Sequence, residues 1–131
     1  MRNSLSILLM LARLLGVVQV VMGFGIWLGM SPATVSIHST LGALFVALLW
    51  AIGLIALVEL PRRSGAVFTL LWGGLVLWLG RAQAILFVGS GHWIIRVAHL
   101  VVGLAALGLV EALGVATKRH RVASHARDAT A

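Results

Sequence analysis

Residues 38–60 read HSTLGALFVALLWAIGLIALVEL, a long run in which Glu59 is the only residue that carries a full charge at neutral pH. A helix needs about 20 consecutive, mostly apolar residues to cross the hydrocarbon core of a bilayer. Three other stretches of the chain have the same character. We therefore expect an all-α integral membrane four-helix bundle, with helices near Leu5–Leu28, His38–Leu60, Val67–Val88 and Ile94–Ala116.

The composition supports this fold class. The chain has 131 residues, of which 61% are hydrophobic and 10% charged, and its mean hydropathy of +1.10 is too high for a soluble domain. The first apolar segment is longer than that of a secretory signal peptide, so we expect it to be a helix of the mature protein. We expect a four-helix domain over 1–117 and a basic, flexible cytoplasmic tail over 118–131.

The positions of the basic residues predict the orientation in the membrane. They gather at the amino terminus, in the second connector and in the tail, and these three regions share one side: Arg2, Arg13, Arg62, Arg63, Lys118, Arg119, Arg121 and Arg127. The positive-inside rule makes that side cytoplasmic, so both termini are expected inside, in the inner membrane of a bacterium. The net charge of +7 is divided among loops, which argues against nucleic acid as a partner and leaves lipid as the expected surroundings.

Two apolar segments contain the pattern His-x-x-x-Gly, at His38–Gly42 and at His99–Gly103. A histidine inside a membrane is costly unless it has a partner, so it indicates function by default. The second and fourth segments run in the same direction, which puts both histidines at the same level on the outer side. Two such histidines indicate a shared ligand.

A second repeat suggests that the chain consists of two helix hairpins of one kind. Leu15-Gly16-x-x-Gln19 in the first segment matches Leu79-Gly80-x-x-Gln83 in the third. Each is followed by an outward loop and then by a His-x-x-x-Gly helix. Two duplicated hairpins would place the second and fourth helices in equivalent positions.

The fourth segment predicts the nature of the ligand. His92, Arg96, His99 and Gly103 are spaced i, i+4, i+7 and i+11, which places them on one helical face. This order suits one haem b standing edge-on in the membrane. Its iron would take an imidazole from His38 and one from His99, while Gly42 and Gly103 leave room for the flat macrocycle. Arg96 and His92 would then bind the propionates.

Arg81 lies inside the third apolar segment, where a cation needs an anionic partner. A haem propionate, a quinone head group or a carboxylate would serve. The acidic residues Glu59 and Glu111 lie toward the inner half, so a bound anionic ligand on the outer side is the favoured explanation. The absence of cysteine excludes thiolate metal sites, iron–sulfur clusters and covalent haem attachment.

Each of these features also has a purely structural interpretation. His92 alone is more readily explained as an interfacial group that bonds to water or to a carbonyl. Gly42 and Gly103 are also compatible with close packing between helices. Arg81 and Arg96 would equally reach the lipid headgroups as snorkelling side chains.

The four helices and paired histidines resemble the membrane cytochromes b, broadly the cytochrome b561 and superoxide oxidase type. The resemblance implies bis-histidine haem b at His38 and His99 and electron exchange with a quinone. Many members carry two haems, but here the inner half has no histidine before the tail, so one haem at the outer side is expected.

The expected function is thus electron transfer at the outer membrane face, as an oxidoreductase component that acts within a larger redox complex or a homo-oligomer. Two alternatives stay open. One is a cofactor-free accessory subunit, and the other is a small four-helix transporter, for which only Glu111 comes near the acidic residue that coupling usually requires.

Overall fold

The computed structural model describes residues 2–129, and this part of the chain is helical with no strand. The four helices are α1 (Arg2–Trp27), α2 (Pro32–Glu59), α3 (Ser64–Ala82) and α4 (His92–Asp128). All four are long and apolar enough to cross a membrane. The predicted all-α, four-helix membrane bundle is confirmed. Residues 1, 130 and 131, at the edges of the two predicted regions, lie outside the described residues.

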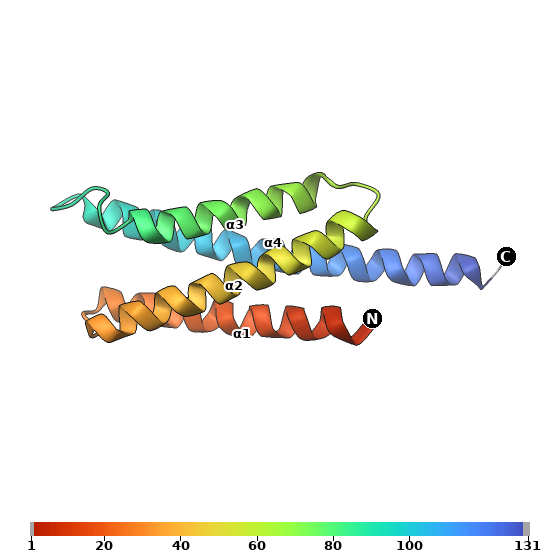
Figure 1. Ribbon diagram of the computed structural model, residues 1–131, viewed down its shortest axis with the longest axis horizontal. Helices are drawn as coiled ribbons and strands as arrows, with labels where there is room; N and C mark the ends of the chain where they lie inside the picture. The colour runs from red at the N-terminus through yellow and green to blue at the C-terminus, as the bar shows by residue number, and fades with distance from the viewer. Residues whose placement is uncertain (1, 130–131) are drawn as a thin grey trace.

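The helices form an up-and-down bundle. α1 packs against α2 and α4, α3 packs against the same two helices, and α2 also contacts α4 across the bundle. Both termini lie at one end, beyond which the last turns of α4 project (Figure 1). We call this the terminal end, and we call the opposite end, with loops 28–31 and 83–91, the histidine end. Because α2 and α4 both begin at the histidine end, residues near their starts lie at similar depth.

The core lies along the middle of the bundle and is built from apolar side chains of all four helices. Its largest fully buried members are Leu5, Leu9, Val46, Leu49, Ile52 and Val110. Two buried threonines each donate a hydrogen bond to a carbonyl of their own helix, Thr69 to Gly65 at 2.9 Å and Thr117 to Leu113 at 2.8 Å. Large apolar side chains also cover the outside, as expected of a surface that faces lipid.

Helix α2 begins six residues before the predicted start at His38. Pro32 occupies the first turn, where its missing N–H costs no hydrogen bond and its fixed φ suits a helix. Ser31 precedes it in extended conformation. His38 therefore lies almost two turns inside α2, and His99 lies at a similar position in α4, seven residues after His92.

Helix α3 ends at Ala82, six residues before the predicted end at Val88. The connector 83–91 turns back through two residues of positive φ, Phe87 at 50° and Gly89 at 103°. Its apolar side chains, such as Ile85 and Val88, are exposed. The connector is as apolar as the helix before it, so hydropathy alone predicted an end of α3 that is too late in the sequence.

Helix α4 continues to Asp128, so the segment 118–128, predicted as a flexible tail, is helical. Part of the reason is an ion pair with α2, in which Arg121 donates two hydrogen bonds to the Glu59 carboxylate, at 2.5 and 2.7 Å. A second ion pair corrects the placement of Arg13 at the amino-terminal surface. Arg13 lies well inside α1 and donates two hydrogen bonds to Glu111 of α4, at 2.5 and 2.6 Å.

Two tryptophans join neighbouring helices by hydrogen bonds. The indole N–H of Trp50 in α2 donates to the carbonyl of Leu70 in α3 at 2.9 Å, and that of Trp72 in α3 donates to Val102 in α4 at 3.0 Å. Gly73 makes the first of these contacts possible, because a Cβ at this position would lie 2.5 Å from the Trp50 Nε1 atom.

Gly73→Ala should therefore destabilise the bundle by about 1–3 kcal/mol, since the added methyl overpacks the contact and displaces the Trp50 hydrogen bond. Gly74→Ala is the matched control, because a Cβ there meets nothing within 4 Å, and its effect should stay within about 0.5 kcal/mol. Unfolding in mixed micelles, followed by circular dichroism, measures both. Equal stability of the two variants would contradict this account of the α2–α3 contact.

Candidate functional site

The structure brings His38 and His99 together, as the sequence predicted. His38 comes from α2 and His99 from α4, and the centroids of the two imidazoles are 6.3 Å apart with 65° between the ring planes. Both residues are partly buried, at the histidine end of the bundle. The parallel direction of α2 and α4 and the contact between them across the bundle explain why the two rings meet.

Neither imidazole is satisfied by the protein. Among the described residues, the Nδ1 atoms of His38 and His99 are the only buried side-chain nitrogen or oxygen atoms without a hydrogen-bond partner. Buried polar groups are normally paired, because burial without a partner costs the lost hydration of the group. Two such atoms side by side indicate a site for a ligand that the protein itself does not supply.

Side chains and glycines of the neighbouring helices hold the pair from outside. The side-chain amide of Gln19 in α1 donates a hydrogen bond to the carbonyl of His38 at 3.0 Å. A Cβ at Gly80 of α3 would lie 3.2 Å from the Cε1 atom of His99, and a Cβ at Gly23 of α1 would lie 3.7 Å from the Cε1 atom of His38. The glycine at position 80 thus lets α3 approach the His99 ring closely, whereas a Cβ at Gly23 would make an ordinary van der Waals contact with the His38 ring.

The two motif glycines have different surroundings. A Cβ at Gly42 would meet the side chain of Gln19 at 3.5 Å, so this glycine takes part in helix packing. A Cβ at Gly103 would meet nothing within 4 Å. The protein thus leaves open space about one turn beyond His99, where the sequence analysis expected room for a macrocycle.

His92 and Arg96 lie closer to the surface than the histidine pair. Together with Trp93 and residues of the connector 83–91 they line a shallow hollow, and neither His38 nor His99 contributes to it. The Nδ1 atom of His92 lies 3.4 Å from the Leu86 carbonyl, a long hydrogen bond to the connector. Arg96 is exposed, and no ion pair joins it to a described residue.

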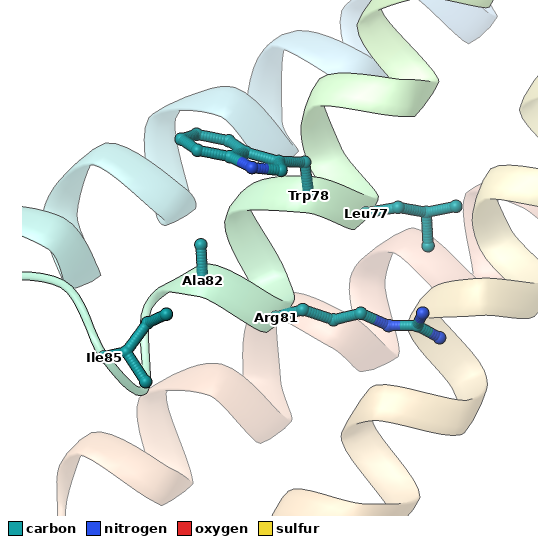
Figure 2. A pocket seen from close by; sticks show the side chains of 5 residues that line it. All are labelled: Leu77, Trp78, Arg81, Ala82 and Ile85. Carbon is teal, nitrogen blue, oxygen red and sulfur yellow. The ribbon is translucent and has the colours of Figure 1, made fainter.

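Arg81 lines a second hollow, at the end of α3 (Figure 2), whose members are Leu77, Trp78, Arg81, Ala82 and Ile85. Its guanidinium and the indole of Trp78 extend to opposite sides of the helix (Figure 2). Arg81 is exposed and follows Gly80, where an added Cβ would lie 3.2 Å from the Cε1 atom of His99. It has no anionic partner among the described residues.

The donor set limits the kind of ligand that would fit. No group of three or more His, Cys, Asp or Glu side chains gathers in the described part of the chain, as a bare metal ion would require. Two imidazoles are enough only for a metal whose other ligands come from a cofactor. The two ring centroids are 6.3 Å apart and the rings meet edge-on, so α2 and α4 offer one imidazole each at the same level.

Comparison with protein families, with curated proteins and with solved structures finds no match to this chain. The resemblance to membrane cytochromes b therefore rests on the histidine motifs and the arrangement of helices alone.

Sequence reasoning missed two features of this site. The first is that Gly23 and Gly80 lie beside the rings, since Gly80 was noticed only as part of the repeated Leu-Gly-x-x-Gln motif and Gly23 was not noticed. The two glutamines of that motif also differ, because Gln19 bonds to the histidine helix, whereas Gln83 follows the end of α3 and makes no side-chain hydrogen bond among the described residues. The sequence feature that could have indicated these glycines is a small residue on the adjacent helix at the same depth as each histidine.

Proposed function

We propose that this chain is a single-haem membrane cytochrome in which His38 and His99 are the two axial ligands of a non-covalent haem b. The proposal includes electron transfer at the outer face of a bacterial inner membrane, with a quinone or another redox subunit as partner. The observation that supports it is the pair of adjacent, partly buried imidazoles, each with a buried nitrogen that has no hydrogen-bond partner in the protein.

The residues around the pair have distinct tasks in this proposal. A bound haem b supplies one-electron chemistry by alternating between ferric and ferrous iron. His38 and His99 would each supply an imidazole nitrogen to its iron. Gln19 bonds to the backbone at His38, and Gly80 leaves room for the His99 ring on the side of α3. The apolar side chains of the bundle keep water away from the site.

The exposed arginines are the candidates for binding the propionates. Arg96 is on the same helix as His99, about one turn closer to the histidine end, and Arg81 follows Gly80, where an added Cβ would lie close to the His99 ring. Both cations lack an anionic partner in the described part of the chain. Carboxylates near guanidinium groups form charge-assisted hydrogen bonds, so an anionic edge of the ligand would be held at this end.

The purified protein should show the sharp reduced-minus-oxidised α-band of haem b. His38→Ala and His99→Ala should each abolish this low-spin spectrum, because each removes one axial nitrogen. His92→Ala is the matched control on the same helix, and it should preserve the spectrum because His92 bonds only to the connector. A colourless protein that takes up no haem on reconstitution would contradict the proposal and favour the cofactor-free accessory subunit.

Gly103→Leu should lower haem occupancy at least severalfold without unfolding the bundle. The protein has open space beside Gly103, so a leucine there meets a bound macrocycle but no described side chain within 4 Å of the Cβ position. Haem content per protein and helical content by circular dichroism measure the two effects separately. Full occupancy in Gly103→Leu would show that the open space is not part of the haem site.

Arg96→Gln and Arg81→Gln should each lower the midpoint potential of the haem. A nearby positive charge favours the form with one more electron, so its removal makes reduction harder. A unit charge several ångströms away contributes on the order of 1 kcal/mol at an effective dielectric of about 20, less where water screens it. That corresponds to some tens of millivolts at about 59 mV per tenfold change.

The larger shift is expected for Arg96, which shares a helix with His99. Redox titration of the two folded variants beside the wild type measures it. Unchanged potentials in both would assign these arginines to the lipid headgroups.

A further inference from the structure

The ion pair between Arg13 and Glu111 lies at an unusual depth. Arg13 is fourteen residues from Trp27, the end of α1 at the histidine end, and eleven from Arg2, the other end. At 1.5 Å per residue these separations are about 21 and 17 Å, so the pair lies near the middle of the membrane-spanning length. The hydrocarbon core is about 30 Å thick, and water is absent from its centre.

The pair also faces outward. The side chains of Arg13 and Glu111 are 52% and 43% exposed on the surface formed by α1 and α4. Their neighbours along α1, Met10 and Leu14, are apolar and about 60% exposed, as expected of a surface that contacts lipid tails. Charged side chains at this depth almost always face the interior of a bundle, a water-filled cavity or one another. Pairing alone leaves about half of each side chain exposed on this surface.

The hydrogen bonds within the pair leave donors free. Arg13 uses its Nε and one Nη atom toward the two oxygens of Glu111. A guanidinium has five N–H donors in a planar fork, so the second Nη group is available for another acceptor. The Glu111 carboxylate has lone pairs available for another donor in the same way.

We propose that the α1–α4 surface around Arg13 and Glu111 is the interface of a homodimer whose twofold axis is parallel to the membrane normal. Such an axis keeps every residue at its own depth, so both ion pairs meet at the same level. Because the positive group lies on α1 and the negative group on α4, rotation by 180° sets each Arg13 opposite Glu111 of the second copy. The two pairs become a closed network of four charges, shielded from lipid.

The α1–α4 surface is thus complementary in charge to itself, and this complementarity selects a second copy of the chain over an unrelated partner. Gly108 and Ala112, on either side of Glu111 in sequence, are exposed on α4. They leave space for the helices of two copies to approach closely. The interface lies toward the terminal end from His38 and His99, so the dimer does not depend on the proposed haem site.

Association in liposomes, measured by fluorescence energy transfer between labelled copies over a range of protein-to-lipid ratios, tests the proposal. The wild type should form dimers and no larger species. Arg13→Leu combined with Glu111→Leu should weaken association by about tenfold or more. The charge-swapped variant, Arg13→Glu combined with Glu111→Arg, should again form dimers, because it restores both the pairs within each copy and those between copies.

Mixing the wild type with the charge-swapped variant gives the sharpest result. In a mixed dimer, arginine would face arginine and glutamate would face glutamate, so each protein should associate with itself at least tenfold better than with the other. Free mixing, or a wild type that stays monomeric at all ratios, would overturn the proposal.

Cysteine cross-linking gives a test that needs no change in the charged residues, since the chain has no cysteine of its own. Leu14→Cys on α1 combined with Ala112→Cys on α4 should cross-link to a covalent dimer on oxidation in the membrane, because the twofold axis sets α1 of one copy opposite α4 of the other. Leu71→Cys, exposed at similar depth on α3, should not cross-link when it is combined with Ala112→Cys. Equal cross-linking of both pairs would show non-specific contact and would also overturn the proposal.

Discussion

A polar group that leaves water and enters hydrocarbon must find a partner, and this constraint explains most of the polar contacts in the bundle. The buried threonines bond to carbonyls of their own helices. The indoles of Trp50 and Trp72 bond to the backbone of neighbouring helices, and Gln19 bonds to the carbonyl of His38. Among the buried side-chain nitrogen and oxygen atoms of the described residues, only the Nδ1 atoms of His38 and His99 lack a hydrogen-bond partner. That failure, in a protein that otherwise satisfies its buried side chains, is the reason to place a ligand there.

The arrangement of the helices determines where this site lies. α2 and α4 run in the same direction and contact each other across the bundle, so a histidine near the start of each reaches the same level. α1 and α3 flank the pair and present Gly23 and Gly80 to the two rings. The two ion pairs lie away from the histidines. Arg13–Glu111 joins α1 to α4, and Glu59–Arg121 joins α2 to α4. Glu111 is therefore paired with a cation. This pairing argues against Glu111 as the proton- or ion-coupling acid of a transporter.

Much of this structure is readable from the sequence, because hydropathy over about 20 residues decides the number of membrane helices. The two His-x-x-x-Gly motifs also predicted the meeting of His38 and His99, since helix direction and depth follow from the topology. Helix ends were harder to predict. Pro32 extends α2 toward the histidine end, and the positive φ at Phe87 and Gly89 ends α3 inside an apolar stretch. Arg13 was assigned to the amino terminus, although it lies well inside α1, because a count of positive charges does not show which acid a side chain reaches on a neighbouring helix.

The central claim is that the imidazoles of His38 and His99 both bind one iron. Its most direct test is pulsed electron paramagnetic resonance of the oxidised protein, purified after growth with ¹⁵N-histidine. The account predicts a low-spin ferric signal with hyperfine coupling to nitrogens of two imidazoles, unchanged when His92, His120 and His125 are replaced together. A signal coupled to one imidazole, a high-spin signal, or no haem signal from correctly folded protein would contradict it.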